Sequence, residues 1–321
     1  TLKDDLKQKE IQEAYDKIVN TAEIKNTLKA DMQSVEIVKN NNNQDIQLIV
    51  PEDINNLSNF IDLRDRKDKE ETYTLDNQGI IITEKLATLL DIKVGDTVTI
   101  KNTDDEEVNA KVSAITENYL YHYMYMSPEL YSNLYNEEMR PNTILALTDD
   151  LTEEQEDALG KQILQDDKIS SIVFTSVSEG IFEDVMNNMT LVVWILIIAA
   201  GLLVLVVLYN LSNTNISERI RELATIKVLG FYNKEVYDYV GHEAIILTAI
   251  GILVGLIGGN FLTTFIIKTC ELDILMFNPY IPASCYIYGI VITAIFALIV
   301  NVTTYFTLKK INMIESLKSV E

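Results

Sequence analysis

The chain has 321 residues, a formal net charge of −22 and a mean hydropathy of +0.10. Residues 1–188 carry 18 Lys/Arg and 39 Asp/Glu, whereas residues 189–321 carry 8 and 9. This division excludes a single soluble globule, and the acidic balance argues against nucleic acid as a partner because an acidic face repels phosphate.

The acidic part begins with a predicted helix and a predicted pair of strands. Residues 1–30 place apolar residues among charged ones at helical spacing, which predicts a helix with one half-buried face. Residues 34–38 and 45–50 flank a turn and predict two paired strands. The segment 52–77 is predicted to be mostly loop.

A small β-unit is predicted next. Residues 79–100 predict a strand, a short helix and a tight turn at Gly95, and a further strand is predicted over 108–115. The segment 119–135 then places six Tyr and two Met in 17 residues. We favour core and sheet-edge positions for these side chains, and the alternative is an aromatic surface that contacts a ligand or partner.

Residues 143–176 predict a βαβ element. Its strands are expected over 143–150 and 169–176, with a helix over 151–165 between them, so that both strands share one sheet. A helix over 178–188 is expected to lead into the first apolar stretch.

The sequence offers no pattern for catalysis or metal binding. His122 is the only histidine of the acidic part, which also has no cysteine, so a metal site built from these residues is excluded. The acidic pairs at 104–107 and 149–150 lack the glycine and the spacing of an EF-hand. No GxSxG, HExxH or Walker A motif occurs. We therefore predict no catalytic residue, no cofactor and no metal, and a protein that is not itself an enzyme.

Three uncharged apolar stretches predict transmembrane helices at about 190–210, 244–267 and 286–308. About 20 helical residues cross a hydrocarbon core of about 30 Å. Buried helices of a soluble protein are the alternative, but they average only about 10–14 residues. The predicted domains are 1–188 and 189–321.

The flanking cations predict the orientation. The segment 209–243 and the C-terminus are rich in Lys and Arg, whereas 268–285 has one Lys set against two acids. The positive-inside rule places 209–243 and the C-terminus in the cytoplasm and residues 1–188 outside the cell. The chain is thus predicted to be a multi-pass protein of the cell membrane. The predicted fold class is thus an α+β extracytoplasmic domain joined to an all-α membrane domain of three transmembrane helices. Because Thr1 follows no apolar signal, we expect an upstream signal or span to be missing from this sequence.

An amphipathic helix is predicted at the cytoplasmic end of the first span. Ile216, Ile220, Leu223 and Ile226 recur on one face, and Gly230 suits its end. A second short helix over 233–241 is expected to return the chain to the membrane. The pattern fits either an anchor on lipid headgroups or a docking helix for a cytoplasmic protein.

The second span carries a stripe of glycines: Gly251, Gly255, Gly258 and Gly259. Its overlapping GxxxG patterns predict close packing with another helix, within the subunit or across a dimer. Glu243 lies at the cytoplasmic mouth of this span, where we favour an ion pair with Arg219 or Arg221 over a proton path. Cys270 and Cys285 flank the outward connection and suit either a disulfide or packing.

At these residues the chain resembles a known family. The segment ERIRELATIKVLGF (218–231), followed by Glu243, is similar to the signature of the FtsX-like, or MacB-type, ABC transporter permeases. The second span AIGILVGLIGG (249–259) and the ending KKINMIESLKSVE (309–321) fit as well. The resemblance covers about 188–321, and the acidic domain is similar to the family's extracytoplasmic core domain in layout. The sequence looks most like the large permeases of Gram-positive bacteria of low GC content.

The resemblance implies a subunit that transmits motion from a cytoplasmic ABC ATPase to the outer domain. It assigns ATPase contact to six residues: Glu218, Arg219, Arg221, Glu222, Lys227 and Gly230. Because the chain has no P-loop, the ATPase is expected to be a separate chain. Family members usually have one span before the outer domain and three after it, and larger members carry two such blocks. The implied permease partner is a second copy or a second block.

Three functions remain open. The first is an ABC permease that exports or extracts a peptide-like or hydrophobic substrate, antimicrobial peptides and lipoproteins being the types that the family suggests. The second is a transmembrane signalling scaffold that activates an extracellular cell-wall hydrolase. The third is a membrane-anchored adhesin or cation-binding domain without an ATPase. The charged inner helix disfavours the third, because an adhesin has no use for it. Only the identity of the extracellular partner would distinguish the transporter from the signalling scaffold.

Overall fold

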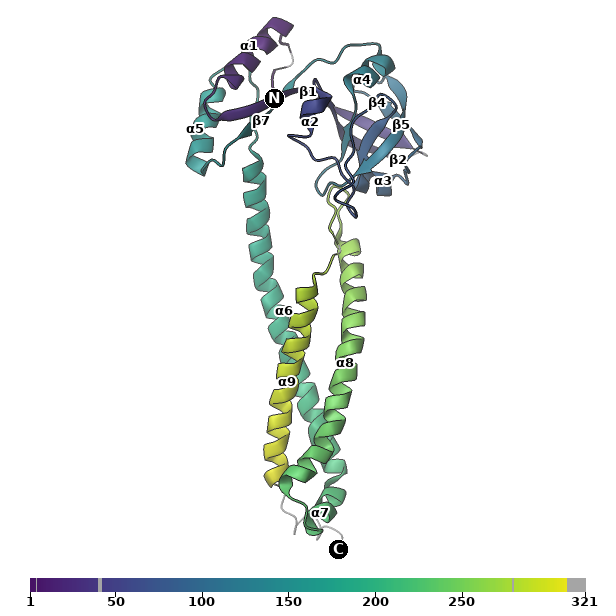
Figure 1. The fold of residues 1–321 in the computed structure, drawn as a ribbon, viewed down its shortest axis with the longest axis vertical. Coiled ribbons are helices and arrows are strands. Elements are labelled where there is room, and N and C mark those ends of the chain that lie inside the picture. The colour runs from purple at the N-terminus through teal and green to yellow at the C-terminus, as the bar shows by residue number, and fades with distance from the viewer. Residues whose placement is uncertain (4, 40–41, 279, 311–321) are drawn as a thin grey trace. The chain divides into compact units, whose positions relative to one another are not determined.

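The computed structural model describes residues 1–3, 5–39, 42–278 and 280–310, and the chain divides into two compact units (Figure 1). We call residues 1–177 together with 271–277 the sheet unit, and the remainder the helical unit. The chain crosses between the units after residues 177, 270 and 277. Each unit is described by itself.

Seven strands form the sheet unit, in the order β2-β6-β3-β5-β4-β1-β7. Their bounds are β1 (Ile24–Lys39), β2 (Asn42–Pro51), β3 (Ile80–Thr83), β4 (Thr97–Lys101), β5 (Glu107–Thr116), β6 (Tyr123–Tyr125) and β7 (Thr143–Thr148). An additional pairing of β1 with β2 closes the first six strands of this order into a barrel. The predicted strand pair 34–38 and 45–50 is confirmed within β1 and β2, which are longer than expected.

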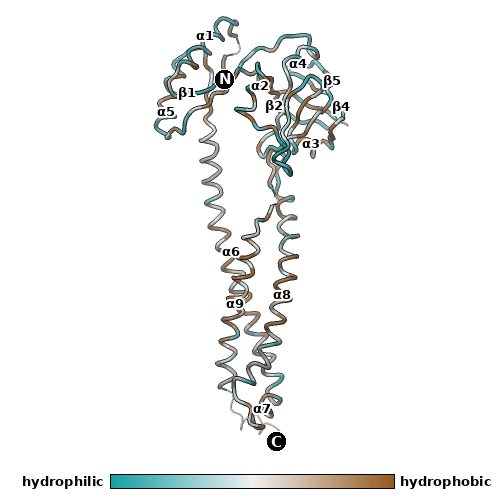
Figure 2. Tube along the Cα trace, in the orientation of Figure 1, coloured by the Kyte–Doolittle hydropathy of each residue, from teal (hydrophilic) through white to brown (hydrophobic). Residues whose placement is uncertain are grey.

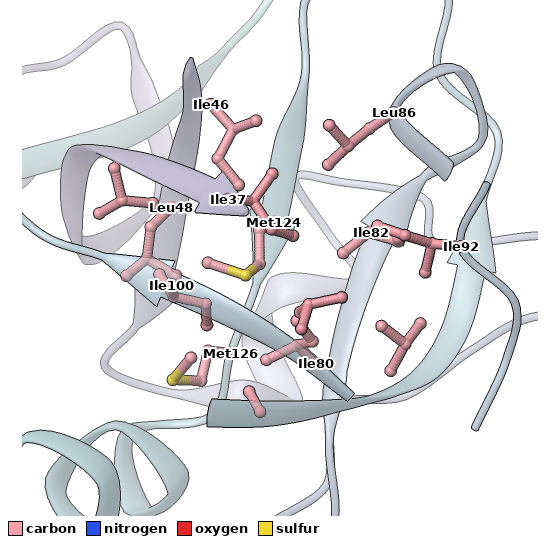
Figure 3. Close-up of a cluster of buried hydrophobic side chains, with 14 of the residues drawn as sticks. Ile37, Ile46, Leu48, Ile80, Ile82, Leu86, Ile92, Ile100, Met124 and Met126 are labelled. Carbon is pink, nitrogen blue, oxygen red and sulfur yellow. The ribbon is translucent and has the colours of Figure 1, made fainter. Parts of the chain in front are cut away.

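The barrel core follows from the alternation of side chains along each strand. Ile80 and Ile82 point into the barrel, where they meet residues such as Leu48 and Met124 (Figure 3). Ile81 lies on the opposite face, in a second apolar cluster that also contains Tyr125. This period of two is what a β-strand imposes when both of its faces are covered.

Five shorter helices complete the sheet unit: α1 (Gln8–Val19), α2 (Ile54–Leu57), α3 (Glu84–Leu89), α4 (Pro128–Tyr135) and α5 (Glu153–Ile163). Gly95, between α3 and β4, has φ of 96° and donates its N–H to the carbonyl of Val112, as its predicted turn requires. Ala14 and Ile18 of α1 are buried in a separate cluster with Leu2 and Ile169.

Two predictions in this unit are wrong. The helix expected over 1–30 ends at Val19, because the chain from Ile24 onward pairs with β7 as the first half of β1. The second strand of the βαβ element, expected over 169–176, is absent among the described residues. Ile169 makes only an isolated bridge with Leu2, and a helix begins at Thr175. Ile169 thus pairs with the N-terminal segment at Leu2, although the prediction placed it in the sheet. The α+β class itself is confirmed.

The helical unit is built from α6 (Thr175–Glu218), α7 (Ile220–Val228), α8 (Asn233–Cys270) and α9 (Ala283–Lys310), of which α6 starts in the sheet unit. Three segments of the described chain are long and apolar enough to cross a membrane: Thr190–Glu218, Ile245–Cys270 and Ala283–Thr303. Figure 2 shows apolar residues following one another along these helices. The three predicted transmembrane helices are therefore confirmed in length and composition. The separate helix expected over 233–241 is instead the first part of α8.

One tight contact between helices in this unit lies at Gly201, a position that no sequence pattern singles out. A Cβ at Gly201 of α6 would lie 2.5 Å from the ring of Phe296 on α9. At the four stripe glycines of α8, an added Cβ would meet nothing within 4 Å. Among the described residues, α6 and α9 thus approach each other closely at Gly201. Packing of the glycine stripe of α8 against another chain remains a proposal.

We predict that Gly201→Leu destabilises the helical unit by about 1–3 kcal/mol, because the side chain must displace Phe296. The measurement is unfolding of the full chain in mixed micelles, followed by far-ultraviolet circular dichroism. Gly255→Leu is the matched control, and under conditions where the chain is monomeric it should leave stability unchanged. Equal losses for the two variants would contradict this packing.

Candidate functional site

The connection between α8 and α9 folds as part of the sheet unit. We call residues Glu271–Phe277 the strap; they follow directly on Cys270, the last residue of α8. A connection of this length between two apolar helices needs no contact with a separate domain. Its inclusion in the sheet unit is therefore a specific property of this chain.

Backbone hydrogen bonds hold the strap to residues 119–121, which precede β6. The N–H of Tyr121 donates to the carbonyl of Ile274 at 2.8 Å, and the N–H of Met276 donates to the carbonyl of Tyr119 at 3.0 Å. Leu120 and Leu275 form an antiparallel bridge between these bonds. We call the two paired segments, 119–121 and the strap, the ribbon.

An ion pair fixes the start of the strap to α3. Nζ of Lys85 lies 2.9 Å from Oε2 of Glu271, and only 11% and 18% of the two side chains are exposed. The other oxygen of Glu271 accepts the N–H of Phe277 at 3.0 Å, which closes the strap on itself. Burial raises the pKa of Glu271, but the hydrogen bonds from Lys85 and Phe277 outweigh it, so that the pKa is lowered. Removing either partner would leave a poorly solvated charge.

His122 is buried next to the strap. Its side chain is 5% exposed, and the backbone of Asp273 approaches the ring without forming a well-aligned hydrogen bond to either nitrogen. Burial lowers the pKa of His122, and the nearby Lys85 lowers it further. The backbone and the carboxylate of Asp273 both raise the pKa of His122, but by less than burial and Lys85 lower it. The imidazole is therefore neutral at pH 7.

No pattern in the sequence connects these residues. His122 is a lone histidine there, and Glu271 and Asp273 are two acids of an outward connection. Lys85 is a single lysine in a short predicted helix, which by itself predicts no contact. Cys270 and Cys285, which also border this connection, are free and exposed.

The predicted ATPase-docking residues lie where α6 gives way to α7. Glu218 ends α6, and Arg219 falls between the two helices. Glu218 and Glu222 are exposed and Arg219 is half-buried. Ile216 and Leu223 are buried and Ile226 is partly buried, so these residues of the expected apolar face are covered by the protein itself.

The end of α7 also matches the expected geometry. Gly230 has φ of 98°, the left-handed conformation that commonly ends a helix, and it leads into α8. The side chains of Arg221, Lys227 and Glu243 lie outside the described residues. The ion pair expected for Glu243 therefore stays a prediction.

Among the described residues, no group of three His, Cys, Asp or Glu side chains is arranged to hold a metal ion. A pocket of about 580 Å³ opens between the end of α1 and α5, and its lining mixes Lys17 and Glu23 with apolar side chains such as Ile163. Lys17 is paired with Asp166 at 3.1 Å. We assign no chemistry to this pocket.

These features define a class, a membrane protein whose apolar helices carry a folded α+β unit. Residues 194–314, most of the helical unit, match the family model of the FtsX-like permease C-terminal domain. This match confirms the resemblance to the FtsX-like permeases expected from the sequence. No curated protein matches the chain.

Three solved structures are similar to part of the chain. The periplasmic region of MacB from Actinobacillus actinomycetemcomitans is 12% identical, with a TM-score of 0.30 over 48% of this chain and 72% of that one. The extracellular domain of the noncanonic ABC-type transporter YknZ from Gram-positive bacteria is 16% identical, with a TM-score of 0.31 over 50% and 81%. A domain of a putative permease protein from Porphyromonas gingivalis is 11% identical, with a TM-score of 0.26 over 46% and 71%.

We predict that the sheet unit loses stability in acid through His122. Its pKa is lowered in the folded state, so below the unfolded value of about 6.5 the unfolded chain binds a proton that the folded chain does not. The loss is at most about 1.4 kcal/mol per pH unit, and it ends once the pH falls below the folded pKa.

The measurement is urea unfolding of the full chain at pH 7.5, 6.5 and 5.5, followed by near-ultraviolet circular dichroism of the tyrosines. His122→Phe is the control, because it keeps the ring volume and cannot titrate. The variant should gain stability relative to the wild type as the pH falls. A constant difference between the two proteins would show that His122 takes up its proton without opening the fold.

Proposed function

We propose that the chain is the membrane permease subunit of an ABC transporter complex. In this proposal a separate cytoplasmic ATPase hydrolyses ATP, and the helical unit passes the resulting movement to the extracytoplasmic sheet unit. The movement serves the export or extraction of a peptide-like or hydrophobic substrate. The family match over residues 194–314 supports the permease class.

The single observation that carries the coupling is the strap. Since Glu271–Phe277 belongs to the sheet unit, α6 and α8 join that unit directly along the chain, and α9 follows it after residues 278–282. A domain carried on α6 alone would move freely about one hinge. With α8 and α9 attached as well, a change in the spacing or tilt of the helices changes the strain at the sheet unit. The fold thus suits the transmission of movement.

The topology belongs to the same proposal. In it the strap and the rest of the sheet unit lie on the same side of the membrane, because the strap is part of that unit. The α6–α7–α8 turn would lie on the opposite side, and the cations of 209–243 favour the cytoplasm for that side. This is the side on which an ATPase would meet Glu218, Arg219 and Glu222.

A second permease copy or block is the proposed partner within the membrane. The open space around the stripe glycines of α8 supports this, because a helix from another chain can approach there closely. Membrane lipid covers the remaining apolar surface. The signalling scaffold that activates a cell-wall hydrolase remains the alternative, and a substrate, lipoprotein or hydrolase bound to the sheet unit would decide between them.

We predict that the double substitution Arg219→Glu and Arg221→Glu abolishes association with the ATPase, because it reverses two charges on the proposed docking turn. The measurement is affinity purification of the full chain from its native membrane in mild detergent, with mass spectrometry of the proteins that co-purify. A stoichiometric P-loop ATPase is expected with the wild type and not with the variant.

The control is Lys25→Glu with Lys161→Glu, which makes the same charge change on exposed side chains of the sheet unit. This variant should retain the ATPase. Retention by the arginine variant would overturn the docking assignment, and the absence of any ATPase from the wild type would overturn the proposed function.

A further inference from the structure

The ribbon exposes large apolar side chains. Leu120, Tyr121 and Leu272 are 44%, 53% and 61% exposed. Tyr119 and Ile274, at 37% and 48%, lie on the same two segments. We call these five residues the ribbon patch. A soluble domain normally covers such a patch or uses it for binding.

The loop is held in the conformation that presents the patch. Tyr121 has φ of 60°, which is uncommon for a residue other than glycine. The side-chain amide of Asn118 donates to the carbonyls of Leu120 and Tyr121 at 2.6 and 3.1 Å. The N–H of Tyr121 is bonded to the strap. The exposure is therefore built into the fold.

Three acids around the ribbon are paired, whereas Asp273 of the strap is exposed. Glu271 pairs with Lys85, and Glu117, which accepts the hydroxyl of Tyr119, pairs with Arg64. Arg66 binds Glu84 through two hydrogen bonds of 2.6 and 2.8 Å. Such pairing lowers the cost of bringing the ribbon near a low-dielectric phase.

The chain itself limits how far the patch lies from the membrane. The apolar segment Ile245–Cys270 ends two residues before Leu272. Two extended residues span at most about 7 Å, which is similar to the thickness of the headgroup layer on one side of a bilayer. Tyrosine is enriched at that depth because its ring is apolar and its hydroxyl is polar.

We propose that the ribbon patch lies in the headgroup layer of the membrane and binds lipid there. The inference depends on α8 crossing the membrane and not on a partner ATPase, so the two proposals fail independently. A protein partner or a second copy on the patch is the competing outcome.

The test uses tryptophan fluorescence, since Trp194 is the single tryptophan of the chain. In a Trp194→Phe background, Leu120→Trp and Leu272→Trp each place one probe in the patch at an exposed position. The full-length variants are reconstituted into phosphatidylcholine vesicles, with or without bromine on the acyl-chain carbons nearest the headgroup. We expect brominated lipid to cause a large loss of emission from both probes.

Two controls calibrate the result. Val94→Trp in the same background places a probe at a 61% exposed position beside the Gly95 turn, and its emission should not change. The unaltered chain, with Trp194 in the first span, should be quenched and so confirms insertion. If Leu120→Trp and Leu272→Trp are quenched no more than Val94→Trp while Trp194 is quenched, the patch faces water or protein and the proposal is overturned.

Discussion

The ion pair between Lys85 and Glu271 makes the α8–α9 connection a part of the sheet unit. It acts together with the two backbone hydrogen bonds of the ribbon, and Met276 is 92% buried as a consequence of that docking, its exposure being 8%. Without these contacts the sheet unit would be attached to the helical unit through α6 alone. With them, α8 ends directly before the strap and α9 begins shortly after it, so both helices are joined to the sheet unit along the chain, as α6 is.

Charge is distributed in a way that fits this arrangement. The acidic half of the chain has more than twice as many acids as bases. Near the ribbon, however, Arg64, Arg66 and Lys85 each form an ion pair with a glutamate. Exposed acids elsewhere keep the unit soluble, whereas paired acids next to the ribbon tolerate a less polar surrounding. His122 adds a neutral ring to the same place, where a second cation beside Lys85 would be costly.

Local sequence patterns predicted most helices and strands, but they did not predict the contacts between segments that are distant along the chain. Hydropathy predicted the three apolar helices, and the pattern of residues 34–50 predicted the second part of β1 and most of β2, because each depends on neighbouring residues. Residues 169–176 have the composition of a strand but meet Leu2 instead of a sheet edge, which no local pattern reveals. The stripe of glycines in α8 was conspicuous, yet the tight contact is at Gly201, where a single glycine faces Phe296. The strap was missed for the same reason, since Lys85 and Glu271 lie 186 residues apart.

The most direct test of the account is hydrogen–deuterium exchange of the full chain in a lipid bilayer, read at the amides of Tyr121 and Met276. Both donate across the ribbon, so the account predicts exchange as slow as that of the neighbouring strands of the barrel. Lys85→Met should accelerate exchange at both amides and leave the barrel strands unchanged. Exchange of both wild-type amides at the rate of an unstructured loop would show that the strap is not docked, and the coupling of α8 and α9 to the sheet unit would fall with it.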